Sequence, residues 1–532
     1  MATSSSDTPK STRKRGGALK AALEAIIPAA RFGDERTILA GTGQSVVGMV
    51  VAIVATFGTQ VLITRSLGAS AFGIVTLATQ GALVLGYFSR FGMDMAAVRR
   101  VAIDMGQGER SRVRAIVNRA SVISILSSLV VATLVFAFAE PIARSFVSDS
   151  VDAATAAFRA AAVAIPFAAL VQVYLGATRG LKIMRHTLYV FWMGQPLGWF
   201  ALILGGWLVA RSVGMTTLAY AASWALATAV AAWLWFRETR GFGHEPPMPG
   251  EVKDLLKYGG PRAPAALFSQ LLFWTDVFVL ARFAPSEQVG IYSAAARAGQ
   301  VILLFIISVS LIFSPFVADL HARGEKEKLD RLYKQLTRWT LAVTLPVFIV
   351  LSAAPGPALR LFGAEFGAGA TALGILLLGQ LVNVATGTVG FILIMVGRTG
   401  WDLVVYAASV AFDIVAAVFL IAGLDLGIEG AAIAGALTMA LSKVARLWLV
   451  WKFLGIQPFT RDYARLAIPT AAGLAGAFAV HLVLKGGAWP VDLVGTAIAG
   501  SLAYGVVLLL AGLPAGERRT IQRLVAHALG RS

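Results

Sequence analysis

Runs of apolar residues recur along the whole chain, and each is about as long as a helix needs to cross a membrane. A run holds ~20 residues, and at 1.5 Å per residue ~20 residues cross the ~30 Å hydrocarbon core of a bilayer. The composition agrees, because 57% of the 532 residues are hydrophobic and only 14% are charged. An average soluble domain has about 25% charged residues. We therefore expect an all-α membrane protein and exclude a water-soluble globule.

The apolar runs indicate about fourteen transmembrane helices. They are expected at 45–64, 74–92, 120–139, 160–177, 188–209, 216–236, 263–283, 292–316, 339–356, 370–396, 402–423, 430–453, 466–484 and 492–512. The tenth run is long and is interrupted by Gly379, Gly387 and Gly390.

Basic residues lie mainly in the short connections between the runs. With the N-terminus in the cytoplasm, 38 of the 46 Lys and Arg residues fall on the inner side. The other eight are Arg65, Arg144, Arg159, Arg211, Arg282, Arg297, Arg360 and Lys485. Cytoplasmic connections of membrane proteins carry this excess, and a wrong span count would scramble it after the error. The sequence therefore predicts an even number of spans with both termini cytoplasmic. The net charge of +18 does not indicate a nucleic-acid partner, because no folded basic domain carries it.

Two segments far apart in the chain share one pattern. Arg65 lies eight residues before Gly73, and Arg282 lies eight residues before Gly290, an offset of 217 residues. Near the same offset, Arg179 after the fourth span corresponds to Arg398 after the tenth. The members of each pair lie on the same expected side of the membrane, which indicates a parallel repeat of six spans. Duplicated halves of this kind are typical of transporters, which bind substrate where the halves meet.

The fold prediction is an all-α membrane protein with two six-helix lobes in a parallel repeat, followed by two C-terminal helices. The expected divisions are a cytoplasmic basic tail at 1–43, an N-terminal lobe at 44–240, a C-terminal lobe at 241–456, two further spans at 457–513 and a cytoplasmic tail at 514–532. Residues 18–31 form a modest amphipathic stretch, either a helix on the membrane surface or part of a disordered tail.

No enzyme motif is present in the sequence. It holds no GxxxxGKS/T phosphate loop, no HExxH motif and no cysteine. Common nucleotide, zinc and thiol sites depend on these motifs and residues. The connections are short and leave no room for the large outer domains of glycosyltransferases and polysaccharide polymerases. We expect no enzyme activity, no cofactor and no metal site.

Four ionisable residues lie inside apolar spans, namely Asp276, Arg297, Asp413 and Lys443. A charge at the bilayer centre costs about 2.5–3.5 kcal/mol on insertion scales, so each needs a partner or a water-filled cavity. Asp276 and Arg297 are expected at equal depth in one hairpin, and Asp413 and Lys443 in another, which makes two ion pairs feasible. These pairs either only lock two helices together, or they line a cavity and engage an anionic substrate or a coupling ion.

Three segments of the chain resemble bacterial polysaccharide and O-antigen flippases. Residues 62–74 (LITRSLGASAFGI) are similar to the first-hairpin signature of that family. Residues 276–297, followed by 313–320, resemble its central signature, and residues 427–434 (GIEGAAIA) match the start of its twelfth span. The resemblance runs from about residue 40 to 455. The superfamily also holds multidrug and toxin extrusion exporters and the lipid II flippase.

The resemblance implies a V-shaped pair of lobes around a cationic cavity. It also implies a transporter that flips an undecaprenyl-diphosphate-linked oligosaccharide across the bacterial plasma (inner) membrane by alternating access. Such oligosaccharides supply O-antigen of lipopolysaccharide, capsule or exopolysaccharide. The expected partners are the lipid-linked oligosaccharide, membrane lipids, a coupling ion (proton or sodium) and a polysaccharide polymerase.

Arg90 and Arg446 lie near expected cytoplasmic ends, where snorkelling to the headgroups is the simpler interpretation. Against the lipid II flippase motif, however, Arg90 and Arg297 fall at positions that resemble essential arginines. Arg90 therefore joins the candidate substrate-binding residues. The further arginines of that family's first span have no counterpart in residues 45–64, which argues against lipid II as the substrate.

Two other transporter functions stay open. A cation-coupled multidrug exporter of the same superfamily would favour acidic residues in the N-terminal lobe, and spans one to six are nearly free of them. A lipid II flippase is the second. A membrane enzyme of glycan assembly is disfavoured by the short outer connections.

The charge distribution yields a topology prediction. Reporter fusions at Ser532 and within residues 237–262 should read cytoplasmic, and fusions near Asp149 and Asp425 should read external, because of the positive-inside bias. Paired phosphatase and fluorescent-protein reporters measure this. An external Ser532 would mean an odd number of spans and would contradict the prediction.

Overall fold

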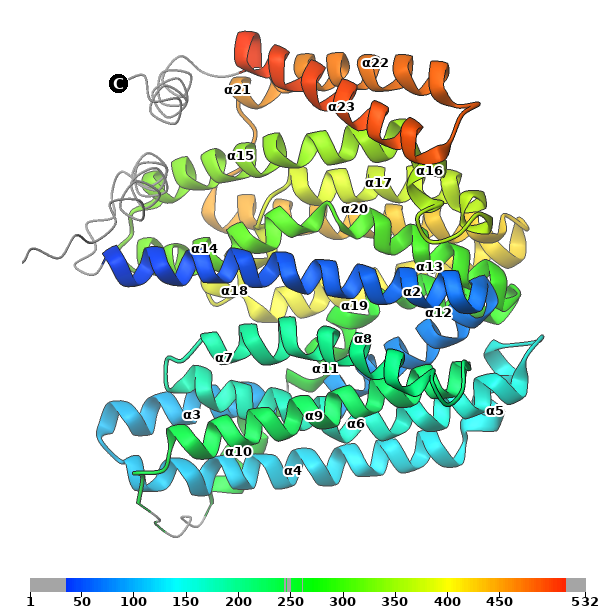
Figure 1. Cartoon of the computed structure of the whole chain (residues 1–532). Helices are drawn as coiled ribbons and strands as arrows, with labels where there is room; N and C mark the ends of the chain where they lie inside the picture. The colour runs from blue at the N-terminus through cyan, green and yellow to red at the C-terminus, as the bar shows by residue number, and fades with distance from the viewer. Residues whose placement is uncertain (1–34, 244, 246–249, 261, 513–532) are drawn as a thin grey trace, which may run out of the picture.

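The computed structural model describes residues 35–243, 245, 250–260 and 262–512, and every regular element in them is a helix (Figure 1). The predicted all-α membrane fold is confirmed. The expected amphipathic stretch at 18–31 and the C-terminal tail lie outside the described residues. The longer elements are α2 (Glu35–Ser89), α3 (Met93–Gln107), α4 (Arg110–Ala137), α5 (Ala139–Phe146), α6 (Val151–Gly180), α8 (Gln195–Gly206), α9 (Val213–Glu238), α10 (Glu251–Gly259), α11 (Arg262–Leu271), α12 (Thr275–Phe283), α13 (Ser286–Gln300), α14 (Leu303–Ala322), α15 (Lys326–Ala353), α17 (Ala370–Ala385), α18 (Val389–Met395), α19 (Thr399–Val418), α20 (Gly427–Leu454), α22 (Ala467–Leu484) and α23 (Trp489–Val507). The shorter ones are α7 (Arg185–Thr187), α16 (Pro355–Leu359), α21 (Arg461–Ala464) and the turns η1 (Leu188–Gly194), η2 (Glu365–Gly369), η3 (Phe419–Gly423) and η4 (Leu508–Gly512).

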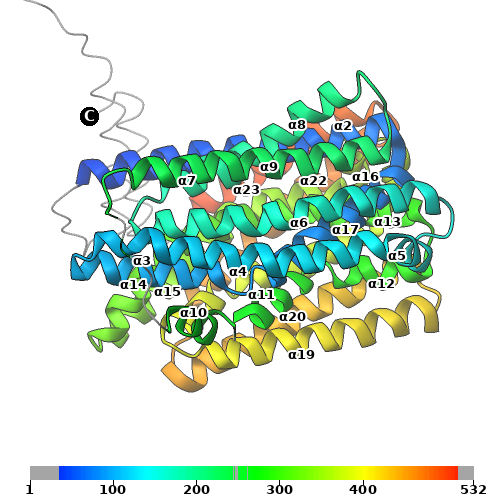
Figure 2. The ribbon, with the colours of Figure 1, turned by 90° about the horizontal axis from the view of Figure 1, so that it is seen from below.

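The helices run nearly parallel and pack as two groups with α2 between them (Figures 1 and 2). In the first group, α6 packs on α3, α4 and α9, while α8 packs on α9. In the second, α20 packs on α17 and α19, and the final hairpin of α22 and α23 lies on α15. The first part of the chain thus forms one group and the later part the other. The domain boundaries expected from the sequence stay a prediction.

Among the described residues, fewer helices qualify as membrane spans by length and composition than the fourteen that the sequence predicted. Among the described residues, eleven helices are long and apolar enough to cross a membrane, or twelve if the bent pair α11 and α12 is one span. The difference from fourteen has two visible sources. One candidate span, Val51–Ser89, covers both the first and the second expected runs. The expected run at 292–316 is divided between α13 and α14.

Gly68 interrupts the longest helix. A straight helix of 55 residues would be about 80 Å long, more than twice the thickness of the hydrocarbon core. At Gly68 the backbone leaves helical geometry, with φ 81° and ψ −179°. Glycine adopts such a positive φ without the steric penalty of a side chain. The break therefore separates the two apolar runs that the sequence predicted as spans one and two.

A second helix break lies in the tenth apolar run, which holds Gly379, Gly387 and Gly390. Between α17 and α18, Gly387 has φ +68° and packs against Thr337. Carbonyl groups freed by a helix break need new donors inside a membrane. The hydroxyl of Tyr333 donates to the carbonyl of Thr386 at 2.7 Å, and that of Tyr463 donates to the carbonyl of Ala385 at 2.7 Å. Two tyrosines thus stabilise the broken helix.

The two helix groups meet where the repeated glycines lie. A Cβ atom added at Gly290 would lie 1.9 Å from the carbonyl oxygen of Ala69, and one added at Gly73 would lie 2.2 Å from that of Ser286. Ala69 and Ser286 are separated by the same 217 residues as Gly73 and Gly290. The contact is therefore made twice, by equivalent residues of the two repeats. Only glycine allows the backbones to approach so closely.

Polar and aromatic contacts reinforce this glycine crossing of α2 and α13. The hydroxyls of Ser70 and Ser286 lie 2.5 Å apart, and Ser286 also donates to the carboxylate of Asp149 at 2.6 Å. The guanidinium of Arg65 donates to the carbonyl of Leu361 at 2.9 Å. These residues all lie at the end of the molecule that the charge pattern predicts to be external. The two groups are closed against each other at that end.

Candidate functional site

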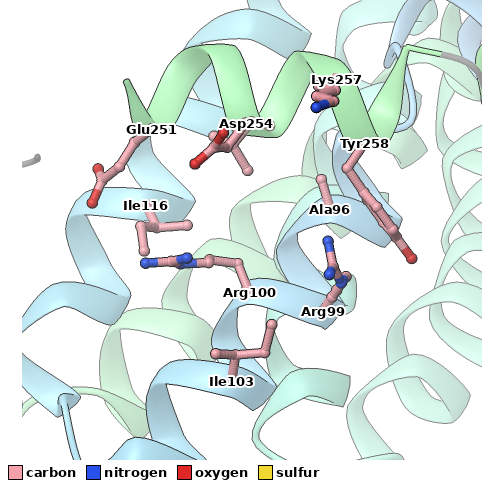
Figure 3. A pocket seen from close by; sticks show the side chains of 10 residues that line it. Ala96, Arg99, Arg100, Ile103, Ile116, Glu251, Asp254, Lys257 and Tyr258 are labelled. Atoms are coloured by element: carbon pink, nitrogen blue, oxygen red, sulfur yellow. The ribbon is translucent and has the colours of Figure 1, made fainter. Parts of the chain in front are cut away.

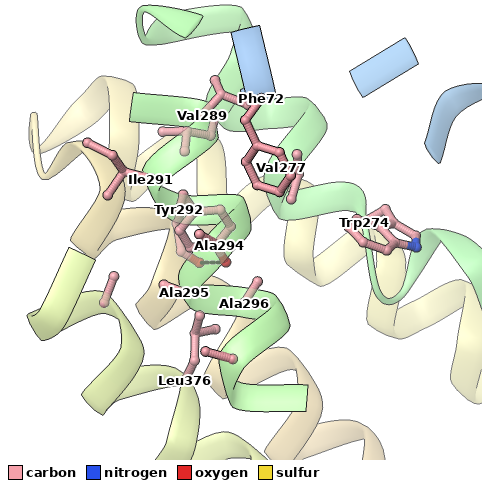
Figure 4. Close-up of a cluster of buried hydrophobic side chains, with 14 of the residues drawn as sticks. Phe72, Trp274, Val277, Val289, Ile291, Tyr292, Ala294, Ala295, Ala296 and Leu376 are labelled. Carbon is pink, nitrogen blue, oxygen red and sulfur yellow. Dashed lines mark hydrogen bonds between the residues drawn. The ribbon is translucent and has the colours of Figure 1, made fainter. Parts of the chain in front are cut away.

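Asp276 and Tyr292 form the centre of a buried polar cluster. Asp276 lies in the first turn of α12, and its carboxylate accepts hydrogen bonds from the Tyr292 hydroxyl and from the backbone N–H of Val277, the latter at 2.8 Å. Tyr292 is 0% exposed, and its ring is surrounded by apolar side chains such as Val277 and Ala295 (Figure 4). Burial of a carboxylate is unfavourable unless hydrogen bonds or charges compensate it. Here the donors are a phenol and a backbone amide.

A second carboxylate, Asp413 of α19, lies in the same region. Asp413 is 1% exposed and accepts a hydrogen bond from the Thr438 hydroxyl at 2.9 Å. The carboxylates of Asp276 and Asp413 are close enough to interact electrostatically. Gly435 of α20 leaves room for them, because a Cβ atom there would lie 2.6 Å from a carboxylate oxygen of Asp276. We call Asp276, Tyr292, Asp413 and Thr438 the acid cluster.

The prediction of an ion pair between Asp276 and Arg297 is wrong. No ion pair joins them among the described residues, because Asp276 binds Tyr292 instead. The prediction compared only the depths of the two residues in the membrane and not the directions of their side chains on α12 (Thr275–Phe283) and α13 (Ser286–Gln300). Tyr292 and Arg297 are five residues apart on α13, so their side chains point about 140° apart. Similar depth in the membrane therefore did not bring the side chains of Asp276 and Arg297 together.

Arg297 is a membrane-embedded arginine without an acidic partner among the described residues. Its guanidinium lies over the ring of Trp274, 4.8 Å from the centroid, and its Nε is buried without a hydrogen-bond partner. It lies close enough to interact with Tyr220 of α9, a helix of the first group. Tyr220 and Trp274 are both buried. Arg297 is therefore an uncompensated cation between residues of the two helix groups.

Lys443 does not form the expected ion pair with Asp413 either. The nearest charged groups that act on it are Arg446 and Asp402, and Asp413 is bound to Thr438 on the same helix as Lys443. The snorkelling interpretation of Arg446 is also wrong. Arg446 is 2% exposed and its guanidinium binds the carboxylate of Asp402 at 2.7 Å. A buried pair needs such geometry to offset its desolvation.

Arg90 lies in a fourth place, in the turn after α2. Its guanidinium pairs with Asp94 at 3.2 Å and lies 4.3 Å from the centroid of the Tyr87 ring. Arg179 at the end of α6 interacts with both Arg90 and Asp94, and its Nε is buried without a hydrogen-bond partner. Two arginines here share one carboxylate, so this site also has an excess of positive charge.

The five candidate residues thus fall into four groups rather than one cluster. Asp276 and Asp413 share the acid cluster, while Arg297, Lys443 and Arg90 each have their own surroundings. Sequence reasoning missed Tyr292, Thr438, Asp402 and Arg179. An acid in an apolar span was a usable signal for Asp402, but hydroxyl partners such as Tyr292 leave no mark in a charge pattern.

Comparisons with known proteins agree with this fold. A family profile described as polysaccharide biosynthesis protein matches residues 38–321, more than half of the chain. A second profile, MatE, matches residues 261–419. A probable low-salt glycan biosynthesis flippase from Haloferax volcanii is 23% identical over 287 residues, which are 54% of this chain and 57% of that relative. The matched region thus spans little more than half the length of that relative.

Solved structures of transporters share the architecture. The lipid II flippase MurJ in an inward closed conformation superposes with a TM-score of 0.69 at 15% identity, covering 88% of this chain and 98% of that one. An inward-facing multidrug transporter of the MATE family has a TM-score of 0.64 at 13% identity, covering 77% and 98%. A transporter from Pyrococcus furiosus has a TM-score of 0.57 at 16% identity, covering 85% and 99%. These identities are low and the likeness concerns the fold, which is that of the multidrug/oligosaccharidyl-lipid/polysaccharide exporter superfamily. Within that superfamily, the chain belongs to the polysaccharide biosynthesis protein family.

Proposed function

We propose that the protein flips an oligosaccharide linked to undecaprenyl diphosphate across the bacterial plasma membrane, for O-antigen, capsule or exopolysaccharide. The observation that carries this proposal is Arg297, a cation without an acidic partner among the described residues. It lies eleven residues, about 16 Å of helix, from Ser286 at the glycine crossing. That distance is about half of the hydrocarbon thickness. A diphosphate would supply the negative charge that Arg297 lacks.

Guanidinium groups suit this substrate for a physical reason. Arg binds phosphate oxygens through two parallel N–H donors, and such charge-assisted hydrogen bonds are strongest where water is excluded. Arg90 and Arg179 give a second excess of positive charge in the first helix group. We propose that the diphosphate is met by these arginines at the inner side and by Arg297 deeper in the membrane. The isoprenoid chain would stay in the lipid throughout.

Alternating access follows from the glycine crossing. The two helix groups are closed at the expected outer end, so substrate held near Arg297 could leave outward only if α2 and α13 separate there. Rocking of two repeats around a central site is the usual movement of transporters built from duplicated halves. We propose that the described state accepts substrate from the cytoplasm.

The acid cluster is our candidate for the coupling-ion site. Two buried carboxylates repel each other, and here their side-chain donors are the hydroxyls of Tyr292 and Thr438. A proton or a sodium ion held between them would remove the repulsion. The cluster touches α12, α13, α19 and α20, so ion binding there would act on the helix that carries Arg297. We further propose a polysaccharide polymerase as the partner that receives the glycan.

Two observations weigh against the other functions of the superfamily. The buried acid cluster lies in the second helix group, whereas the buried Asp94 of the first group is paired with Arg90. A multidrug exporter for cationic compounds would need free acids at its binding site. The arginines that lipid II flippases carry in the first span are missing from residues 45–64.

Replacing Arg297 tests the substrate role. Arg297→Ala should lower surface glycan at least about tenfold at unchanged protein level, because a hydrogen bond to a charged group contributes about 1.5–3 kcal/mol. The matched control is Arg159→Ala, another arginine of a membrane-spanning helix, which lies over Phe136 at 5.8 Å and is exposed. It should export normally.

A double variant separates binding from structure. Because Asp276 is bound to Tyr292, the Asp276→Ala/Arg297→Ala protein should remain inactive. Export restored in that protein would show that Arg297 only balances a charge.

In vesicles, Asp413→Asn should abolish the dependence of flipping on a proton or sodium gradient. An unchanged dependence would contradict a role of the acid cluster in ion coupling.

Deletion of the gene tests the substrate class. Lipid-linked oligosaccharide should accumulate on the cytoplasmic leaflet and one surface polysaccharide should disappear, while peptidoglycan synthesis continues. Extraction of lipid-linked sugars measures the first effect, and sensitivity to cationic drugs is recorded in parallel. An unchanged lipid-linked pool together with new drug sensitivity would favour the multidrug exporter instead.

A further inference from the structure

A cavity of about 480 Å³ lies between α3, the beginning of α4 and α10 (Figure 3). Helix α10 belongs to the connection between the two helix groups. Arg99 and Arg100 of α3 lie on one side of the cavity, and Asp254, Lys257 and Tyr258 of α10 lie on the other. None of these residues takes part in the proposed transport site.

Two of the charged groups in the cavity wall are already neutralised. Arg100 pairs with Asp104 at 3.1 Å. Glu251, the first residue of α10, accepts a hydrogen bond from Arg112 at 3.2 Å. The second pair holds α10 against α4, and both pairs leave other charges to determine what the cavity binds.

The remaining charges give a cationic site around Tyr258. Arg99 lies 4.6 Å from the centroid of the Tyr258 ring and Arg262, just outside the cavity wall, lies 5.1 Å from it. Neither arginine has an ion pair among the described residues, and Lys257, which directly precedes Tyr258, also lines the cavity. The unpaired acid of the wall is Asp254. Two guanidinium groups on one ring repel each other, and an anion between them would remove that repulsion.

We propose that this cavity binds the phosphate of an anionic membrane lipid. Guanidinium forks and a tyrosine hydroxyl are suited to phosphate oxygens. Met95, four residues before Arg99 on α3, and Leu256, next to Lys257 on α10, are each 38% exposed. Both helices thus carry an exposed apolar side chain near these cations, which favours a lipid as the source of the phosphate. Both helices also lie in connections that the charge pattern predicts at the cytoplasmic leaflet, whose surface is anionic.

The bound phosphate would tie the connection between the helix groups to the first group. Arg99 comes from α3, whereas Lys257 and Arg262 come from α10 and the start of α11. One phosphate held by both sides fixes α10 in place. Anionic lipid would thus stabilise the described conformation.

The test measures thermal unfolding of the full-length protein in neutral detergent, with dioleoyl phosphatidylglycerol, dioleoyl phosphatidylcholine or sodium phosphate added. Phosphatidylglycerol should raise the unfolding temperature, because a ligand that binds only the folded state stabilises it. Phosphatidylcholine should do so much less, since its trimethylammonium group is repelled. In Arg99→Gln/Arg262→Gln, the phosphatidylglycerol concentration for the half-maximal shift should rise at least about tenfold.

The matched control is Arg398→Gln. Arg398 is exposed on the same expected side and lies 4.6 Å from the Phe453 ring, but it shares that ring with no second arginine. This variant should respond like the unaltered protein, and Arg99→Lys/Arg262→Lys should keep part of the response. Equal shifts with both lipids, a normal response of the double glutamine variant, or full stabilisation by sodium phosphate alone would each overturn the proposal.

Discussion

Inside hydrocarbon every polar group of the chain needs a partner, and this constraint determines most of the structure. It makes the membrane-crossing segments helical, because only a helix satisfies the backbone of a single crossing segment. It also explains how the helices can be broken. At the break between α17 and α18, the hydroxyls of Tyr333 and Tyr463 bind the freed carbonyl groups. Irregular backbone is tolerated there because the protein supplies the donors that lipid lacks.

The same constraint sorts the embedded charges by function. Arg446 binds the carboxylate of Asp402, and we interpret this pair as structural. The acid cluster is satisfied by hydroxyls but keeps two carboxylates near each other, as an ion site requires. Arg297 has an aromatic neighbour and no acid among the described residues. A cation that the fold leaves uncompensated is the residue best suited to an anionic substrate.

Sequence reasoning predicted the helical membrane fold and the repeat offset. These follow from apolar length, glycine positions and residue identity, which are local in the sequence. The pairing of charges could not be predicted, because it depends on the directions in which side chains point. Asp276 accepts a hydrogen bond from the Tyr292 hydroxyl and forms no ion pair with Arg297 among the described residues. The offset of 217 residues identified Gly73 and Gly290 as equivalent, but only the coordinates reveal that each packs against the backbone of the other repeat.

The central claim is that transport requires α2 and α13 to separate at the glycine crossing. The chain has no cysteine, so a disulfide can be placed there without background. The hydroxyls of Ser70 and Ser286 lie 2.5 Å apart, which suits a Ser70→Cys/Ser286→Cys pair. Flipping of lipid-linked oligosaccharide should stop in proteoliposomes when this pair is oxidised and return when it is reduced, while either single cysteine leaves flipping intact. Undiminished flipping by fully cross-linked protein would contradict the account.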